Sequence, residues 1–209
     1  MPSYLLGLDL GQAQDYTALV IAETRMEPTG TLWSGAAPKK CYDVRHLERF
    51  PLGTSYPQIV ASVVDRCAAQ PAPGYSDLPP QLVVDATGCG RPVVDLLRDA
   101  QPRADLVPIT ITGGDSVGGG AGGYQTVPKR DLASTLAVLL QAARLNVAPA
   151  LPDAAVLQQE LLNFKVKITA AGHDSYSAWR ENQHDDLVLA AALACWWGER
   201  KSPWLWEVL

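Results

Sequence analysis

The sequence predicts a single α/β domain whose sheet is covered by helices. Its middle holds an apolar run at residues 81–85, an amphipathic segment at 91–100 and a second apolar run at 106–111. That order is typical of a βαβ unit, in which a right-handed crossover helix joins two buried parallel strands. The 209 residues are close to the roughly 100–200 of one domain and contain no internal repeat. We therefore expect residues 1–209 to form one domain.

The N-terminal part is predicted to begin with strands. Residues 4–10 and 16–23 are apolar, and a loop too long for a tight turn joins them, which favours two paired strands. A third strand is expected at 41–50, after an interval rich in glycine and proline. Apolar residues at helical spacing predict a helix at 57–69, and the proline-rich stretch 71–80 ends it.

The C-terminal part is predicted to be mainly helical. Seven glycines occur in the eleven residues 113–123 and show no apolar period, so this segment is a mobile loop or the tip of a hairpin. Helices are expected at 129–144 and 152–164 from their apolar faces. The last helix, 184–197, is apolar almost all round, so it should pack on several sides. Short strand-like pieces lie between these last two helices, at residues 165–169 and 174–178.

Composition excludes several classes of protein. Hydrophobic residues make up 47% and charged residues 19% of the chain, which excludes a disordered chain. No apolar run reaches the roughly 18 residues of a membrane span, and the N-terminus lacks the pattern of a signal peptide. Four cysteines without a CxxC pair argue against a zinc site and fit a reducing cytoplasm. The net charge of −5 neither indicates nor excludes a nucleic-acid partner.

Four acidic residues lie at the ends of otherwise apolar elements. Asp9 lies in the first strand, Asp85 closes the fourth, and Asp185 and Asp186 open the last helix. A buried carboxylate is costly unless it is paired, hydrogen-bonded or bound to metal. If the first and fourth strands are neighbours, Asp9 and Asp85 converge, and the start of a helix can bring the other acids beside them. Oxygen ligands of this kind select Mg²⁺ or Mn²⁺, and two such ions can clamp a phosphodiester during displacement.

Each acid also has a plain structural interpretation. Asp9 could cap a turn with Gly11, and Asp85 could form an Asx-turn with the residues that follow its strand. Asp185 and Asp186 could simply lie in the first turn of a helix, where the helix dipole favours anions. The order strand, strand, helix, with one acid at the end of each element, favours a common site.

The motifs GLDLGQAQDYTALVI, VVDATGCG, VPKRDL after a glycine-rich segment and HDDLVLAAALA resemble the nuclease domain of phage terminase large subunits. The resemblance extends from residue 5 to residue 197. It implies a ribonuclease H-like fold, with a mixed five-stranded sheet flanked by helices and an inserted glycine-rich β-hairpin. It also implies an endonuclease that cuts concatemeric double-stranded phage DNA with two Mg²⁺ or Mn²⁺ ions.

By the same resemblance, Asp9, Asp85 and Asp186 are the catalytic, metal-binding triad, and Asp185 is a fourth ligand. The implied partners are double-stranded DNA, a packaging ATPase, a small terminase subunit and a portal, in the cytoplasm of a bacterial host. Terminase large subunits carry an N-terminal ATPase domain, which these residues lack. The glycine-rich run has no GK[ST] to form a P-loop. A separated nuclease domain or a stand-alone gene product is therefore expected.

Other polar residues are candidates for accessory roles. Asp15 could support the metal site or be a turn residue, and His184 could order a water or a phosphate or have no role. The later part of the chain has the more basic balance, which favours a DNA-binding face there. The candidate DNA-binding residues are Lys129, Arg130, Lys165 and Lys167.

Three other functions compete with this hypothesis. GLDLG followed by a second strand is also typical of the first phosphate loop of sugar kinases and actin-like ATPases, although that class needs two such domains and a longer chain. A nuclease of the Holliday-junction resolvase type would carry the same site. A non-catalytic packaging partner would have no need of all four acids.

Overall fold

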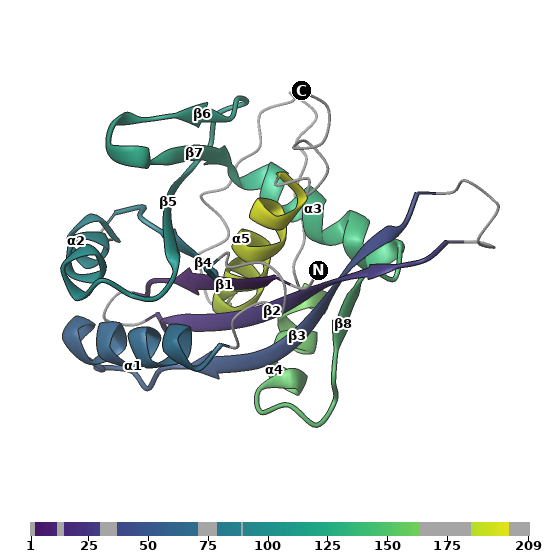
Figure 1. Cartoon of the computed structure of the whole chain (residues 1–209), viewed down its shortest axis with the longest axis horizontal. Coiled ribbons are helices and arrows are strands. Elements are labelled where there is room, and N and C mark those ends of the chain that lie inside the picture. The colour runs from purple at the N-terminus through teal and green to yellow at the C-terminus, as the bar shows by residue number, and fades with distance from the viewer. Residues whose placement is uncertain are drawn as a thin grey trace.

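The computed structural model describes residues 3–11, 15–29, 37–70, 79–88, 90–163 and 185–200 (Figure 1). They form one eight-stranded sheet with the order β6-β7-β5-β4-β1-β2-β3-β8. The strands are β1 (Tyr4–Asp9), β2 (Ala18–Glu27), β3 (Lys39–Arg49), β4 (Gln81–Asp85), β5 (Asp105–Thr112), β6 (Gly118–Gly119), β7 (Gln125–Pro128) and β8 (Leu145–Val147). The α-helices are α1 (Tyr56–Ala69), α2 (Gly90–Ala100), α3 (Lys129–Gln141), α4 (Ala154–Asn163) and α5 (Asp186–Arg200).

The predicted fold class is confirmed, and the sheet is larger than expected. Its central strands β3-β2-β1-β4-β5 are the five predicted ones: β1, β2 and β3 pair antiparallel, whereas β4 and β5 continue the sheet in parallel from β1. The predicted glycine-rich hairpin is present as β6 and β7, joined by a 3₁₀ turn at Ala121–Gly123, and β7 extends the sheet parallel to β5. At the other edge β8 pairs parallel with β3.

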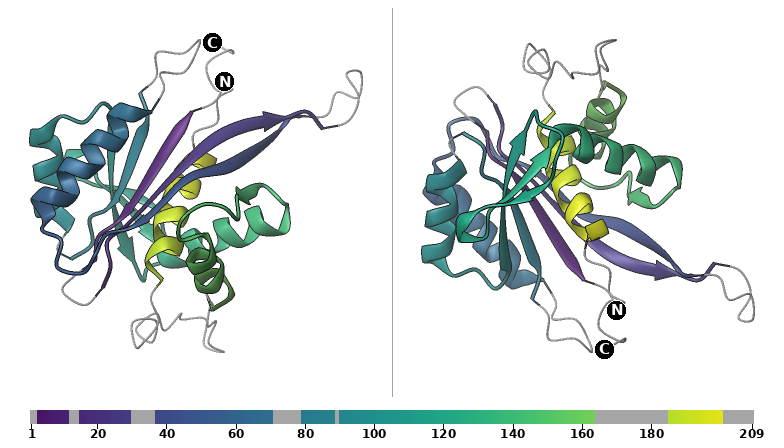
Figure 2. Two further views of the ribbon diagram at one scale, coloured as in Figure 1. Left: turned by 90° about the horizontal axis from the view of Figure 1, so that it is seen from below. Right: turned by 90° about the horizontal axis from the view of Figure 1, so that it is seen from above.

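Helices cover the two faces of the sheet separately. Helices α1 and α2 lie on one face, and α3, α4 and α5 lie on the other (Figure 2). Because side chains alternate along a strand, Leu6 and Leu8 of β1 pack into the α1–α2 layer, whereas Leu5 packs into the layer that contains α5. The same alternation places Asp9 on the α5 face of the sheet.

Helix α5 packs directly against β1, as its nearly uniform apolar sequence predicted. Most of its residues are buried, from Asp186 to Gly198. Gly7, in the middle of β1, makes this contact possible, because a Cβ atom there would lie 1.9 Å from the backbone carbonyl oxygen of Ala190. The absence of a side chain at Gly7 therefore sets the height at which α5 crosses the strand.

Several boundaries differ from the sequence-based expectations. The helix expected at 129–144 ends at Gln141, because the chain reverses through Ala143, with a positive φ of 48°, to enter β8. The last helix runs from Asp186 to Arg200 rather than over 184–197. The strand-like pieces expected at 165–169 and 174–178 lie outside the described residues. None of the described helices is long and apolar enough to cross a membrane.

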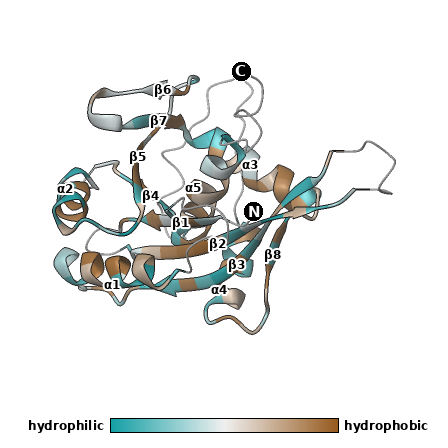
Figure 3. Ribbon diagram, viewed as in Figure 1, coloured by the Kyte–Doolittle hydropathy of each residue, from teal (hydrophilic) through white to brown (hydrophobic). Residues whose placement is uncertain are grey.

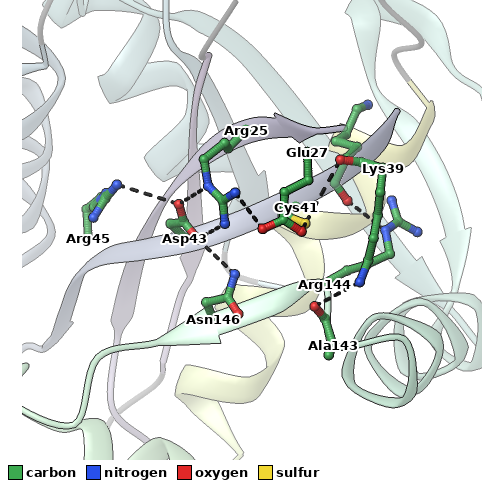
Figure 4. A network of polar contacts seen from close by, with 10 residues as sticks. Arg25, Glu27, Lys39, Cys41, Asp43, Arg45, Ala143, Arg144 and Asn146 are labelled. Carbon is green, nitrogen blue, oxygen red and sulfur yellow. Dashed lines mark hydrogen bonds and ion pairs between the residues drawn. The ribbon is translucent and has the colours of Figure 1, made fainter. Parts of the chain in front are cut away.

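The outer ends of β2 and β3 project beyond the sheet and are mainly hydrophilic (Figures 2 and 3). Charged side chains link them to each other and to β8 (Figure 4). Arg25 pairs with Asp43 at 3.0 Å and with Glu27 at 2.7 Å, and Asn146 of β8 donates to Asp43 at 2.8 Å. Exposed ion pairs contribute only about 0–1 kcal/mol each, so this network mainly fixes how the strands and β8 lie against one another.

Candidate active site

Asp9 and Asp85 lie side by side at one edge of the sheet. Strands β1 and β4 are parallel neighbours with Leu8 opposite Val84, so the next residue of each strand reaches the same edge. The charges of the two carboxyl groups act on each other, and Asp9 is buried. The predicted convergence of these acids is what the structure shows.

The plain interpretations of these two acids have different outcomes. Asp85 does form an Asx-turn, because its Oδ1 accepts a hydrogen bond from the Thr87 backbone N–H at 2.8 Å. Gly11, by contrast, donates its backbone N–H to the Thr17 hydroxyl at 3.1 Å, so Thr17 closes the turn after β1. The turn orients Asp85 while the contact with Asp9 remains, so the local and the functional interpretations of Asp85 are compatible.

Asp185 and Asp186 lie at the start of α5, on the same face of the sheet as Asp9. Asp185 precedes the helix, and its carbonyl oxygen accepts the hydrogen bond of the Leu189 N–H at 2.9 Å. Each side chain has a cationic partner. Asp185 pairs with Lys129 Nζ at 3.4 Å, and Asp186 pairs with Arg49 Nη2 at 3.0 Å.

Asp9 and Asp85, the two strand acids, have raised pKa values and so hold a proton more strongly than ordinary aspartates do. Burial, followed by repulsion from Asp85, Asp186 and Asp185, raises the pKa of Asp9 well above its usual range, and the charge of Lys129 opposes this shift. Burial also raises the pKa of Asp85, although its hydrogen bond from the Thr87 N–H and the charge of Lys129 oppose the shift. Burial and the repulsion between neighbouring carboxylates therefore favour the uncharged form of Asp9 in the absence of another cation.

Two charged residues at the site, the half-buried Arg49 and the buried Glu160, were not predicted. Arg49 ends β3 and lies in register with Asp9 across the sheet, through Ala18 of β2. Glu160 of α4 is 3.1 Å from Arg49, and its Oε2 accepts the Val188 N–H in the first turn of α5 at 3.0 Å. Burial raises the pKa of Glu160 to about 7. Position 160 follows the buried Leu157 by three residues, so helical spacing could have placed it on the inner face.

Of the candidates for accessory and DNA-binding roles, the structure describes Lys129, Arg130 and Asp15. Lys129 is a member of the site, with its side chain 14% exposed beside Asp185. Arg130 pairs instead with Asp115 of the segment before β6, at 2.6 Å. Asp15 is exposed and lines a cleft of about 400 Å³ between the turn after β1 and the start of α1. His184, Lys165 and Lys167 lie outside the described residues.

The chemistry of the four acids fits a divalent cation, because the charges of Asp85, Asp185 and Asp186 all act on the buried Asp9. Among the described residues, however, no three His, Cys, Asp or Glu side chains are gathered closely enough to hold an ion. Asp185 and Asp186 are instead paired with Lys129 and Arg49.

Solved structures with the same architecture are terminase nucleases. The chain superposes on the large terminase nuclease of thermophilic phage G20c with a TM-score of 0.57 and 22% identity, over 92% of this chain and 81% of that one. For the Mn-soaked human cytomegalovirus terminase nuclease domain the TM-score is 0.54 at 11% identity, over 92% and 82% of the two chains. No family profile and no curated protein matches the sequence. The chain therefore has the ribonuclease H-like fold of terminase nuclease domains.

Proposed function

We propose that this protein is a metal-dependent endonuclease that cleaves double-stranded DNA. The observation that carries the proposal is the convergence of Asp9 and Asp85 at the ends of neighbouring parallel strands, below the acids that open α5. The shared fold with terminase nucleases, one of them solved after soaking with Mn, supports both the class of reaction and the choice of metal.

Asp9, Asp85 and Asp186 would hold two Mg²⁺ or Mn²⁺ ions, with Asp185 as a further ligand. Such ions supply Lewis-acid activation of a water and charge neutralisation at the phosphate. Asp9 is the central ligand because it interacts with all three other acids. Asp85 is oriented by the Thr87 N–H, and Lys129 balances the excess negative charge. Burial of Asp9 keeps its carboxylate away from bulk water, which strengthens its attraction for a cation.

The DNA would approach from the edge of the sheet that carries these acids. Lys129 begins α3 directly after β7, so the glycine-rich hairpin is joined to the site through this residue. We propose that the hairpin guides duplex DNA and that the protein acts on DNA in genome packaging, together with a packaging ATPase, a small terminase subunit and a portal. Arg130, Lys165 and Lys167 are the further candidates for phosphate contacts.

Incubation of the purified protein with supercoiled plasmid tests the proposal. We expect nicked and linear products with Mn²⁺ and none with excess chelator. Calorimetric titration with Mn²⁺ should show binding that is lost in Asp85→Asn. A protein that binds ATP and leaves DNA intact with every divalent metal would support the kinase-like alternative and contradict the nuclease. Preferential cleavage of four-way junctions over linear duplex would favour a resolvase.

The role of the hairpin is tested by shortening residues 118–123. Strand β7 also pairs with β5, so the sheet should keep its edge and the melting temperature should change little. Cleavage of duplex DNA should change, whereas binding of Mn²⁺ should not. Loss of folding would show that the glycines are structural and would contradict a guiding role.

A further inference from the structure

The half-buried Arg49 and the buried Glu160 and Asp186 form an ion triad whose arrangement suggests a second state. We propose that Arg49 is the countercharge of Asp186 in the metal-free protein, and that Arg49 exchanges Asp186 for a two-point pair with Glu160 when Asp186 turns to a divalent cation. The inference rests on the proposed function, since it assigns positioning roles to Arg49 and Glu160 at the same site.

One guanidinium nitrogen serves both carboxylates of the triad. Arg49 Nη2 is 3.0 Å from Asp186 Oδ2 and 3.1 Å from Glu160 Oε1. The side chains are exposed by only 17% for Arg49, 7% for Asp186 and 5% for Glu160, so water does little to screen them. Arg49 therefore contacts both acids through the same nitrogen and forms a two-point pair with neither of them.

Two atoms of the triad lack a hydrogen bond. Arg49 Nε and Glu160 Oε1 are buried, and neither has a hydrogen-bond partner among the residues that the structure describes. Buried polar groups are rarely left in this way, because each loses its interactions with water without compensation. Here the unsatisfied donor and the unsatisfied acceptor belong to the same ion pair.

A two-point pair between Arg49 and Glu160 would satisfy both atoms. The Nε–H and Nη2–H of a guanidinium point to the same side and match the two oxygens of a carboxylate, which makes such pairs stronger than single contacts. In forming this pair, Arg49 would move its Nη2 from Asp186 to Glu160. The cost of releasing Asp186 would thus be offset by the new bonds to Glu160.

Arg49 and Glu160 each keep an anchor when the contact with Asp186 is broken. The guanidinium carbon of Arg49 lies 4.5 Å from the centre of the Tyr16 ring, a cation–π contact. Glu160 accepts the Val188 N–H of α5. The remaining pair is electrically neutral, so no buried charge is left without a partner. The contact between Arg49 and Asp186 can therefore be broken while Arg49 and Glu160 keep their other contacts.

Nitrogen-detected NMR of the wild-type protein tests the exchange without relying on cleavage. On addition of Mg²⁺ alone, the Nε–H resonance of Arg49 should move to lower field and its exchange with water should slow, because Nε–H gains an acceptor. An Arg49 Nε–H signal that does not respond in a protein that binds Mg²⁺ and cuts DNA would overturn the exchange and leave the nuclease intact. A wild-type protein that neither binds the ion nor cuts DNA would overturn both.

The variant Arg49→Lys separates partner exchange from simple charge. Lysine keeps the charge and cannot make the two-point pair. We expect Mn²⁺ to bind about tenfold more weakly, since one hydrogen bond between charged groups is lost. Arg45→Lys is the matched control on the same strand, because Arg45 is exposed and pairs with Glu23 at 2.8 Å rather than with an acid of the site; its affinity should stay close to that of the wild type. A folded Arg49→Lys protein with wild-type affinity would contradict the proposal.

Discussion

Asp9 and Asp85, the strand acids, differ from Asp185 and Asp186, the helix acids, in what balances their charge. The pKa values of the strand acids are raised, mainly by burial, so protonation is favoured and relieves the repulsion at Asp9. The helix acids each have a side-chain cation, Lys129 for Asp185 and Arg49 for Asp186. Protonation thus relieves the repulsion between the strand acids, whereas ion pairs with neighbouring elements balance the charge of the helix acids.

The difference follows from where the acids lie in the fold. Strands β1 and β4 lie in the centre of the sheet, and α5 packs against β1, so Asp9 is buried at the end of its strand. The start of α5 faces the beginning of α3 and the end of β3, where Lys129 and Arg49 are available. A divalent cation that binds here would have to displace a proton from one half and side-chain cations from the other.

The largest expected effect belongs to Asp9→Asn, which removes a strand acid and keeps its shape. Cleavage of plasmid at saturating Mn²⁺ should fall by more than about 100-fold, because even groups that only orient metal ligands contribute roughly 10–100-fold. Without metal, the variant should fold and be more stable than the wild type in urea, since a repelled buried carboxylate is gone. Undiminished cleavage would remove Asp9 from the site.

Substitution of the two helix acids should lower cleavage by different factors, and the smaller loss is expected at Asp185. Asp186 is buried, whereas the Asp185 side chain is 24% exposed beside Lys129. We expect Asp186→Asn to lower cleavage by about 100-fold or more and Asp185→Asn by about tenfold, on the scale set by residues around metals. Asparagine also caps helices well, so Asp185→Asn should not loosen α5. Equal losses in initial cleavage rates would show that both acids are equivalent ligands.

The same contrast shows what the sequence could and could not predict. The central strands and the convergence of Asp9 and Asp85 followed from apolar runs and from acids at their ends, and the hairpin followed from the glycine-rich run and the family resemblance. Strand β8 was missed because a three-residue strand has too few residues to show alternation. Arg49 and Glu160 were missed because each is an ordinary polar residue in its own element, and only the pairing of β3 with β2 and the packing of α4 on α5 bring them to Asp186.

Gly7→Ala should move the two halves of the cluster apart. Its Cβ would lie 1.9 Å from the backbone oxygen and 2.9 Å from the carbonyl carbon of Ala190, so α5 must shift away from β1. Overpacking of this kind costs about 1–3 kcal/mol in the free energy of unfolding, and the affinity for Mn²⁺ should fall as well. Gly119→Ala in β6 is the matched control, since its nearest neighbour is a side-chain atom at 4.0 Å. Equal stabilities of the two variants, measured in urea, would show that α5 adjusts freely.

The smallest expected effect is on how the stability of the metal-free protein depends on pH. The pKa of Asp9 is raised in the folded state, so its proton stabilises the fold fully below the pKa of an unfolded aspartate, and this stability is lost as the pH rises through the raised value. Glu160 acts in the same direction, from 4.5 to about 7. With chelator present, the free energy of unfolding should therefore fall between pH 4.5 and pH 8.

Asp9→Asn should flatten this decline more than Asp185→Asn does, because Asp185 is only one of several causes that raise the pKa of Asp9. The slope that remains in Asp9→Asn should level off above pH 7, once Glu160 has lost its proton. Urea unfolding at several pH values measures these slopes. Addition of Mn²⁺ should reverse the decline in the wild type, because an ion then replaces the proton of Asp9. Identical slopes in the two variants would mean that strand and helix acids are balanced in the same way, and the distinction between them would fail.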